Sequence, residues 1–294
     1  MFTWAWTERF IFDMRPKKFL GQHFLTAPAF AKKIADAVPA SAEEYVLEIG
    51  PGRGALSVRL LERFPNLRLV EVDTDAVNIL REKLDAEIRR IDNDDNISDS
   101  GKRGAGAYAI HNEDVMSFDF SLAGFPLHAV GNLPYNIGAL IIRKTLALAP
   151  SVLSCTFMVQ REVAARIVSA PHSRENGFLS IFCQFFGEAK LLFHVPPGAF
   201  FPRPNVDSSV FQVIVDRGVE KKLPRALWEN FFSFVSGGFS MRRKQLAKTL
   251  SLKFGRDKEY YGNTLFEMGM DAAARPEDLD VDGWLNLYKR VGQQ

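Results

Sequence analysis

The segment Gly131-Asn132-Leu133-Pro134-Tyr135 brings together groups that could hold a small planar amine. The Asn132 side chain and the Leu133 carbonyl offer two oxygen acceptors, and Tyr135 offers an aromatic face for stacking. Pro134 has no N–H and favours an extended conformation at Leu133. The alternative interpretation is an ordinary turn built from Asn and Pro, with Tyr135 as a half-buried anchor.

A second candidate site is the glycine-rich segment Gly50-Pro51-Gly52-Arg53-Gly54, which lies between a predicted strand and a predicted helix. The pattern fits a relaxed dinucleotide-binding loop, and alone it does not separate a nicotinamide enzyme from an S-adenosylmethionine enzyme. Glu48 places a carboxylate beside the loop and Pro51 removes one N–H, whereas a pyrophosphate requires N–H donors and no nearby anion. S-adenosylmethionine has no phosphate and carries two positive groups that an acid would stabilise.

Two more acids follow predicted strands. Glu71 ends the strand predicted over residues 67–72, where it could bind ribose hydroxyls, and Asp114 follows the strand predicted over residues 108–112, where it could accept from an adenine amino group. The alternatives are a surface ion pair for Glu71 and a helix N-cap for Asp114. With Glu48, these acids favour S-adenosylmethionine as the cofactor.

Strands and helices alternate along the part of the chain that must position these residues, which predicts an α/β fold with a doubly wound, mostly parallel sheet. Strands are predicted over residues 45–49, 67–72, 108–112, 127–130, 155–160, 191–195 and 209–215. Helices are predicted over residues 28–38, 55–64, 73–90, 137–148, from Arg161 onward, and over 178–186, 228–235, 242–250, 258–268 and 276–291.

Three stretches interrupt this rhythm. Residues 91–107 are polar and glycine-rich without apolar periodicity, which predicts a flexible surface insertion; a calcium loop is the alternative, but the EF-hand spacing is missing. Residues 216–224 are polar and basic, and we expect a linker there. Residues 1–14 are aromatic, make a poor signal peptide, and are interpreted as an N-terminal extension.

Composition narrows the class of protein. The formal net charge of +2 does not indicate a class of binding partner, so any nucleic-acid contact must come from local basic clusters. Cys155 and Cys183 lie in apolar runs, which indicates buried thiols and a reducing compartment such as the cytoplasm. No apolar run approaches the roughly 20 residues that a membrane span needs. We expect no membrane segment and no metal site.

Taken in order, the motifs of residues 17–287 resemble those of the small-subunit (16S-type) ribosomal RNA adenine N6,N6-dimethyltransferase family. The motifs that carry the resemblance are Lys18-Phe19-Leu20-Gly21-Gln22-His23-Phe24-Leu25, Glu48-Ile49-Gly50-Pro51-Gly52, Glu71-Val72-Asp73, Glu113-Asp114, Asn132-Leu133-Pro134-Tyr135, Gln160-Arg161-Glu162-Val163, Phe200-Phe201-Pro202-Arg203-Pro204-Asn205-Val206-Asp207-Ser208, Phe239-Ser240-Met241-Arg242-Arg243-Lys244, Gly269-Met270-Asp271 and Arg275-Pro276-Glu277. Each motif alone is modest evidence, but their joint order is specific.

The resemblance implies two domains. A Rossmann-like S-adenosylmethionine-dependent methyltransferase domain, with a sheet of about seven strands, is expected over residues 15–216, and a small C-terminal α-helical RNA- or ribosome-binding domain over residues 217–294. The residues expected to bind the cofactor are His23, Leu25, Glu48, Gly50, Gly52, Glu71, Asp114 and Asn132. The family often has Asn where this chain has His23, and either side chain can hydrogen-bond the cofactor.

The resemblance also gives the amine an identity, the N6 group of adenine. Asn132 and the Leu133 carbonyl would accept its two N–H bonds before Pro134, and Tyr135 and Phe200 would clamp the ring, although the neighbouring Phe201 is an alternative for that stacking. RNA phosphates would contact basic clusters, for which solvated surface is the alternative interpretation. The candidates are Lys17 and Lys18 beside Arg15, Arg242, Arg243, Lys244 and Lys248, and the set Lys221, Lys222 and Arg225.

The sequence therefore predicts a monomeric cytoplasmic enzyme that dimethylates adenines, two adjacent ones, in the small-subunit ribosomal RNA of an immature subunit. One alternative is a large-subunit RNA methyltransferase of the antibiotic-resistance type, which the basic segment at 242–244 and the ending at 269–277 disfavour. A second is a non-catalytic ribosome-assembly or transcription factor, which the intact Asn132 turn disfavours. A nicotinamide dehydrogenase would leave that turn unexplained and lacks a candidate acid for hydride transfer.

Overall fold

The computed structural model describes residues 22–93 and 107–292. The chain forms two compact units. The first comprises the chain up to Thr145 with Ser154–Arg161 and Leu192–Val210, and the second comprises Leu146–Leu153, Glu162–Leu191 and the chain from Phe211 onward. The expected domain boundary at residues 216 and 217 stays a prediction. The expected N-terminal extension, Lys17, Lys18 and most of the 91–107 insertion lie outside the described residues.

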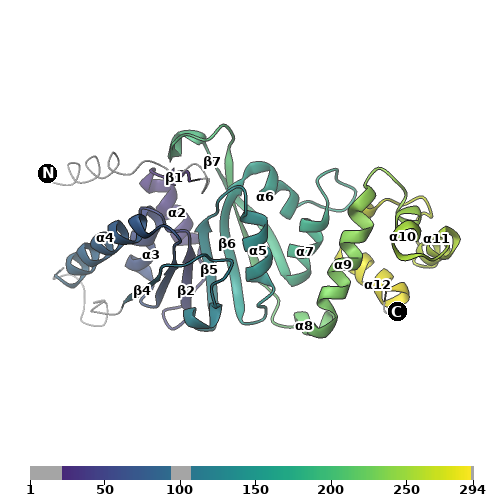
Figure 1. Ribbon diagram of the computed structural model, residues 1–294, viewed down its shortest axis with the longest axis horizontal. Coiled ribbons are helices and arrows are strands. Elements are labelled where there is room, and N and C mark those ends of the chain that lie inside the picture. Colours follow the sequence, from purple (N-terminus) through teal and green to yellow (C-terminus); the bar gives the residue numbers. More distant parts are fainter. Residues whose placement is uncertain (1–21, 94–106, 293–294) are drawn as a thin grey trace. The chain divides into compact units, whose positions relative to one another are not determined.

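A mostly parallel seven-stranded sheet in the order β4-β3-β2-β5-β6-β9-β7 confirms the predicted fold class (Figure 1). Its strands are β2 (Tyr45–Ile49), β3 (Leu67–Val70), β4 (Tyr108–His111), β5 (Leu127–Asn132), β6 (Val152–Gln160), β7 (Gly187–Val195) and β9 (Ser208–Val215). β2 runs parallel to both β3 and β5, and β3 runs parallel to β4. The central strands are apolar and almost fully buried, as expected for a parallel sheet covered on both faces.

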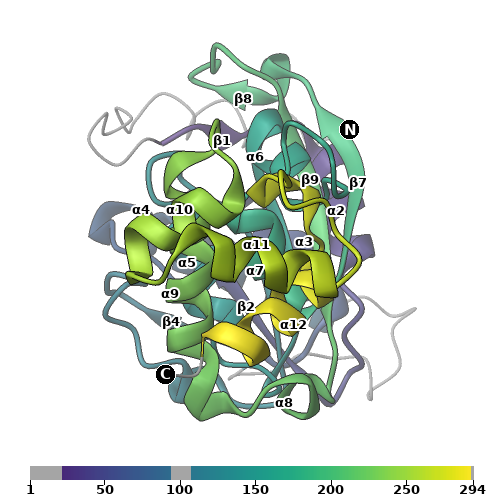
Figure 2. The ribbon, with the colours of Figure 1, turned by 90° about the vertical axis from the view of Figure 1, so that its right-hand side faces the viewer.

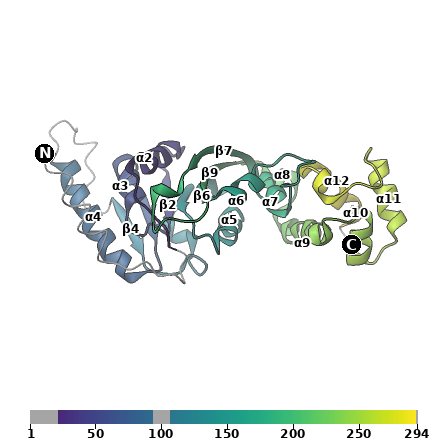
Figure 3. The ribbon, with the colours of Figure 1, turned by 90° about the horizontal axis from the view of Figure 1, so that it is seen from above.

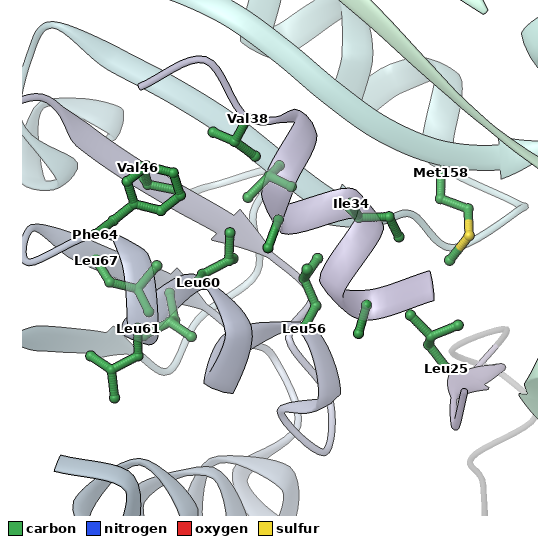
Figure 4. Packing of buried hydrophobic residues seen from close by; sticks show 14 of the residues in the cluster. Leu25, Ile34, Val38, Val46, Leu56, Leu60, Leu61, Phe64, Leu67 and Met158 are labelled. Atoms are coloured by element: carbon green, nitrogen blue, oxygen red, sulfur yellow. The ribbon is translucent and has the colours of Figure 1, made fainter. Parts of the chain in front are cut away.

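The helices of the first unit pack their apolar sides against the sheet, as the spacing of their apolar residues predicts. These helices are α2 (Pro28–Ala37), α3 (Ala55–Arg63), α4 (Thr74–Asp92) and α5 (Gly138–Leu146). Figure 3 shows α2 and α3 on one face of the sheet and α5 on the other. Side chains of α2 and α3, including Ile34, Leu60 and Leu61, meet Val46 of β2 and Met158 of β6 in a continuous hydrophobic cluster (Figure 4). This packing fixes the sheet edge that carries the candidate site.

A short antiparallel ribbon, β1 (Phe24–Leu25) with β8 (Phe200–Phe201), lies outside the main sheet. Phe24 pairs with Phe201, and Leu25 pairs with Phe200. Thr26 extends the ribbon by donating its N–H to the Ala199 carbonyl at 2.8 Å. The sequence predicted neither strand, because two-residue strands carry no periodicity.

The second unit is mainly helical. Its helices are α6 (Arg161–Ile167, which begins at the end of the first unit), α7 (Phe178–Phe186), α8 (Val219–Lys222), α9 (Trp228–Gly238), α10 (Leu246–Phe254), α11 (Lys258–Glu267) and α12 (Val281–Val291). The 3-10 turns in the two units are Phe120–Ala123, Pro197–Ala199, Arg225–Leu227, Phe239–Met241 and Pro276–Asp278. Figure 2 shows α10 and α11 side by side. Trp284 of α12 packs so closely on Gly238 of α9 that a Cβ there would lie 2.3 Å from its ring.

Two predictions about the second unit are wrong in detail. The helix expected over residues 242–250 begins at Leu246, because Arg242, Arg243 and Lys244 form a turn after the 3-10 segment. The expected linker over residues 216–224 contains helix α8, whose Val219 is fully buried. The charged residues of this segment masked its buried apolar residues, Val219 and Leu223. None of the helices in the described ranges is both long and apolar enough to span a membrane.

Candidate active site

A cavity of about 160 Å³ lies at the carboxyl ends of the parallel strands. The strand register places Ile49 beside Val70, and Val70 beside His111, so the residues that follow these strands share one edge of the sheet. The predicted site residues that line the cavity are His23, Leu25, Glu48, Gly50, Gly52, Glu71, Asp114, Asn132, Leu133, Pro134 and Tyr135. Eleven residues chosen from sequence motifs thus meet around one cavity.

Asn132 is held in one orientation by the beginning of the described chain. Its Nδ2 donates to the His23 carbonyl at 2.9 Å, which leaves the side-chain Oδ1 as the atom available to a ligand. The Leu133 N–H donates to the Met158 carbonyl at 3.0 Å and anchors the turn on β6. Gly131 permits the close approach of β5 to β2, because a Cβ there would lie 2.4 Å from the Ile49 carbonyl oxygen.

Tyr135 is half-buried beside this amide and has contacts on its ring and on its hydroxyl. The ring stacks on the His23 imidazole with 5.4 Å between centroids and 26° between planes. The hydroxyl lies 2.8 Å from Ser208 Oγ. Burial raises the pKa of the Tyr135 phenol, and the Ser208 hydrogen bond opposes that rise. Tyr135 is therefore a neutral aromatic wall of the cavity.

His23 links the cavity to the proline-rich segment after β8. Its Nδ1 lies 2.8 Å from the Pro202 carbonyl oxygen, and because a carbonyl only accepts, Nδ1 carries the proton. The imidazole thus contacts Tyr135 on one side and fastens Pro202 on the other.

Glu48 is a buried acid with one unsatisfied carboxyl oxygen. Its side chain is 2% exposed, and its Oε2 has no hydrogen-bond partner within residues 22–93 and 107–292. Burial raises the pKa of Glu48 to about 8; the neighbouring Ser57 hydroxyl lowers it and the Glu71 carboxylate raises it. A ligand with a positive group would satisfy this carboxyl and favour its ionised form.

Glu71 holds the glycine loop in shape. Its two carboxylate oxygens accept the N–H groups of Gly52 and Asp73, both at 2.9 Å. Burial raises the pKa of Glu71, and these backbone donors oppose the rise. Gly52 itself adopts a left-handed φ of +53°, and a Cβ there would lie 3.1 Å from the Phe24 ring. The surface ion pair considered for Glu71 does not describe a side chain that is 5% exposed.

Asp114 lies at the cavity and also begins a turn. Its Oδ1 accepts the Met116 N–H at 2.8 Å, and its backbone carbonyl accepts from Ser117 and Phe118. Part of the capping role considered from the sequence is therefore present. Because a carboxylate has further acceptor sites, the side chain can still accept from a ligand.

Other predicted site residues lie apart from the cavity. Phe200 is 5% exposed, belongs to the hydrophobic cluster and does not line the cavity, whereas Phe201 is 42% exposed. Arg242 donates to the carbonyls of Arg174 and Asn176 at 2.8 and 2.6 Å, so its guanidinium orders a loop of the second unit. The remaining cations of this candidate set, Arg243, Lys244 and Lys248, are exposed.

Phe24 and Arg53 are among the cavity-lining residues that the sequence analysis did not assign to the site. The Phe24 ring lies under the Arg53 guanidinium, 4.5 Å from its carbon, and both residues line the cavity. Arg53 belongs to the glycine loop, where only the glycines and the proline were interpreted. The loop is further held by Lys83, whose Nζ donates to the Arg53 carbonyl at 2.7 Å. No group of three or more metal-ligating side chains occurs in the described part of the chain.

Comparisons with known proteins address the family of this chain. The family model described as ribosomal RNA adenine dimethylase matches residues 14–293. The ribosomal RNA small subunit methyltransferase A of Aromatoleum aromaticum is 36% identical over 282 residues, which is 95% of each chain. The protein of the same name from Alcanivorax borkumensis is 34% identical over 279 residues, covering 94% of this chain and 90% of the relative.

Two solved structures share the fold. A dimethyladenosine transferase from Plasmodium falciparum aligns with a TM-score of 0.74 at 20% identity, over 91% of this chain and 97% of that one. The 23S rRNA methyltransferase ErmE aligns with a TM-score of 0.64 at 22% identity, over 92% of this chain and 100% of that one. Because both structural relatives have this fold, the fold alone does not select a ribosomal subunit.

Proposed function

This chain belongs to the ribosomal RNA adenine dimethylase family, and from that premise we infer that the cavity at Asn132 is its active site. The enzyme is an S-adenosylmethionine-dependent rRNA adenine N6,N6-dimethyltransferase that acts on small-subunit ribosomal RNA. The large-subunit alternative finds no support in the curated relatives at 34–36% identity, which carry the small-subunit name.

The fit of the cofactor rests on the buried carboxyl of Glu48, whose Oε2 has no hydrogen-bond partner among the described residues. S-adenosylmethionine, when bound, supplies an electrophilic methyl group. Glu48 offers a buried acceptor to a positive group, and Glu71 fixes the conformation of the glycine loop. Asp114 offers a further acceptor in the cavity lining. We assign the cofactor to these three acids together with His23 and Gly50.

The single observation that carries the site assignment is the locked amide of Asn132. Since Nδ2 is bonded to the His23 carbonyl, Oδ1 faces a ligand as an acceptor. Oδ1 and the Leu133 carbonyl would accept the two N–H bonds of an adenine N6 group. The amine lone pair, otherwise delocalised into the ring, would then point away from both acceptors, and the nitrogen would be ready to become tetrahedral. Such positioning and electrostatic stabilisation would supply most of the catalysis.

Tyr135 provides one wall for the adenine ring. Its hydroxyl contact with Ser208 and its ring contact with His23 hold that wall before RNA binds, which removes part of the ordering cost. Phe200 would contribute to the clamp from the other side after leaving the hydrophobic cluster. The target base must be splayed out of its strand to reach the cavity.

The methylation test compares wild type with Asn132→Ala on small subunits that lack the modification, using labelled S-adenosylmethionine. We expect the variant to lose methylation by about a hundredfold or more, as when one preorganised transition-state hydrogen bond is removed, while RNA affinity is largely kept. Asn66→Ala is the matched control, since Asn66 also donates its amide to backbone carbonyls but lies at the amino end of β3. Turnover by Asn132→Ala at the wild-type rate would place the amine elsewhere.

The partner and its surface are part of the same proposal. We propose that the enzyme binds, as a cytoplasmic monomer, an immature small subunit through Arg243, Lys244 and Lys248. These cations are exposed and have no ion pair within the described ranges. Two adjacent adenines would be methylated in turn. Analytical ultracentrifugation of the enzyme with immature and with mature small subunits measures how many enzyme molecules bind each subunit and which form of the subunit is preferred.

A further inference from the structure

The two faces of the β1–β8 ribbon differ in their surroundings. Directly paired residues of an antiparallel ribbon point to the same side, and neighbours along each strand point to opposite sides. Leu25 and Phe200 form one pair, and both belong to the hydrophobic cluster, although Leu25 also borders the cavity. Phe24 and Phe201 form the other pair, and Phe24 lines the cavity.

Phe201 therefore lies at the rim of the cavity. Cβ atoms of a directly opposed antiparallel pair are about 4.5–5.5 Å apart. That distance places Phe201 next to Phe24 on the side that faces the site. Phe24 is 8% exposed and is covered by Arg53, whereas Phe201 is 42% exposed. The ribbon thus presents one aromatic ring to the cavity and the next to solvent.

Phe201 is held on a fixed backbone. On one side, Thr26 donates to Ala199 and completes the ribbon. On the other, the Pro202 carbonyl is bound by the His23 ring at 2.8 Å. Pro202 and Pro204 restrict φ on either side of Arg203. An exposed ring on such a backbone loses little conformational freedom when a flat ligand binds to it.

Positive charge accompanies this ring. Arg203 is exposed two residues after Phe201. Arg161 is 62% exposed and lies beside the same segment, since its N–H donates to the Asp207 carbonyl at 2.9 Å. Arg161 is 3.6 Å from the Asp207 carboxylate, a solvent-exposed pair that a phosphate can replace. An exposed aromatic ring with cations beside it is the combination with which proteins bind single-stranded nucleic acid.

We propose that Phe201 stacks on the base next to the target adenine, while Arg203 and Arg161 contact the phosphates of that nucleotide. The proposal rests on the proposed function, because it takes the cavity at Asn132 as the place of the target. A second stacking platform beside the cavity would hold the strand while the target base is splayed out. It would also keep the second of two adjacent adenines at hand.

Steady-state kinetics on unmodified small subunits test the energetic part. Phe201→Ala is expected to raise the KM for subunits by about fivefold or more, as the loss of one base stack predicts. The kcat and the KM for S-adenosylmethionine are expected to stay near the wild-type values, and Phe201→Tyr is expected to restore the KM. Phe125→Ala is the matched control, because Phe125 is 39% exposed and also precedes a proline but leads into the amino end of β5. An unchanged KM for subunits in Phe201→Ala would overturn the proposal.

Cross-linking tests the position. A photoreactive phenylalanine derivative at position 201 is expected to label the nucleotide adjacent to the methylated adenine. Labelling of the target adenine itself would refute the neighbouring-base assignment and would place Phe201 in the clamp around the target base. Labelling of any other nucleotide, or no labelling by a variant that still methylates, would also refute the assignment. Absence of methylation by the wild-type enzyme would instead overturn the proposed function, so the two failures are distinguishable.

Discussion

Replacement of Glu48 by Gln removes a buried carboxyl of the cavity whose Oε2 has no hydrogen-bond partner among the described residues. Glutamine has nearly the same shape and stays neutral, so the substitution changes the charge available at this position with little change in packing. In the folded protein burial raises the pKa of Glu48 to about 8 from its ordinary value of 4.5. The variant is therefore expected to change how stability and cofactor binding depend on pH.

The sign follows from the proton balance. Between pH 4.5 and about 8 the unfolded carboxyl is ionised while the folded one keeps its proton, so folding takes up a proton. The stability that this carboxyl contributes is complete below its unfolded pKa and is lost as the pH rises through the folded pKa. The free energy of unfolding should fall by up to about 1.4 kcal/mol per pH unit, on the order of 5 kcal/mol across the window.

Urea unfolding of wild type and Glu48→Gln at intervals from pH 5 to 8.5 measures this effect. We expect the variant to gain stability relative to wild type as the pH rises. Calorimetry with S-adenosylmethionine supplies the second measurement. Because burial raises the pKa of Glu48 to about 8, binding of a positive ligand at pH 7 should release protons and strengthen with pH. The variant should bind more weakly and without that pH dependence.

Parallel stability curves for the two proteins would refute the reasoning, because they would mean that Glu48 has the same pKa folded and unfolded. Equal proton release by both proteins would assign the released proton to another group. Glu62→Gln is a suitable control, since Glu62 forms an ordinary surface ion pair with Arg59. Its stability difference from wild type should vary little over the same pH range.

Four further outcomes are expected. Tyr135→Phe, which loses only the contact with Ser208, should lower kcat/KM for RNA several-fold, and Tyr135→Ala should lower it further in the same assay. Gly131→Ala should fail to reach wild-type thermal stability, because its Cβ would clash with the Ile49 carbonyl; a normal melting temperature would contradict the close approach. Arg242→Ala should lower the melting temperature, because it removes two hydrogen bonds to backbone carbonyls, and the control Arg243→Ala should lower it less. Alanine at Arg243, Lys244 and Lys248 together should reduce the slope of log affinity against log salt by about two to three, and an unchanged slope would remove these residues from the RNA surface.

The sequence predicted the sheet and the gathering of the site well, because both depend on local pattern. Continuous apolar runs marked the buried strands, with β2 predicted at its observed bounds. Because parallel strands place their carboxyl ends at one edge, the acids and Asn132 that follow those strands had to meet. Neither inference required knowledge of a side-chain orientation.

The parts that the sequence did not predict depend on contacts between distant segments. The register of β1 against β8 decides that Phe200 faces the core and Phe201 faces solvent, and two-residue strands show no period from which this could be inferred. Arg242 was interpreted by its charge alone, whereas its guanidinium bonds to two backbone carbonyls more than 60 residues away. Every residue has a backbone carbonyl, so residue types do not show which carbonyl a side chain will bind.

The connection between the start of the described chain and the rest of the site has a consequence for biosynthesis. His23 bonds to Asn132, 109 residues later, and to Pro202, 179 residues later, so both contacts that hold His23 are complete only after residue 202 has left the ribosome. At a translation rate of about 5–20 residues per second, the segment at 22–26 waits many seconds for its partners. Because this contact closes so long a loop, we expect the fastening of His23 to Pro202 to be a late step of folding.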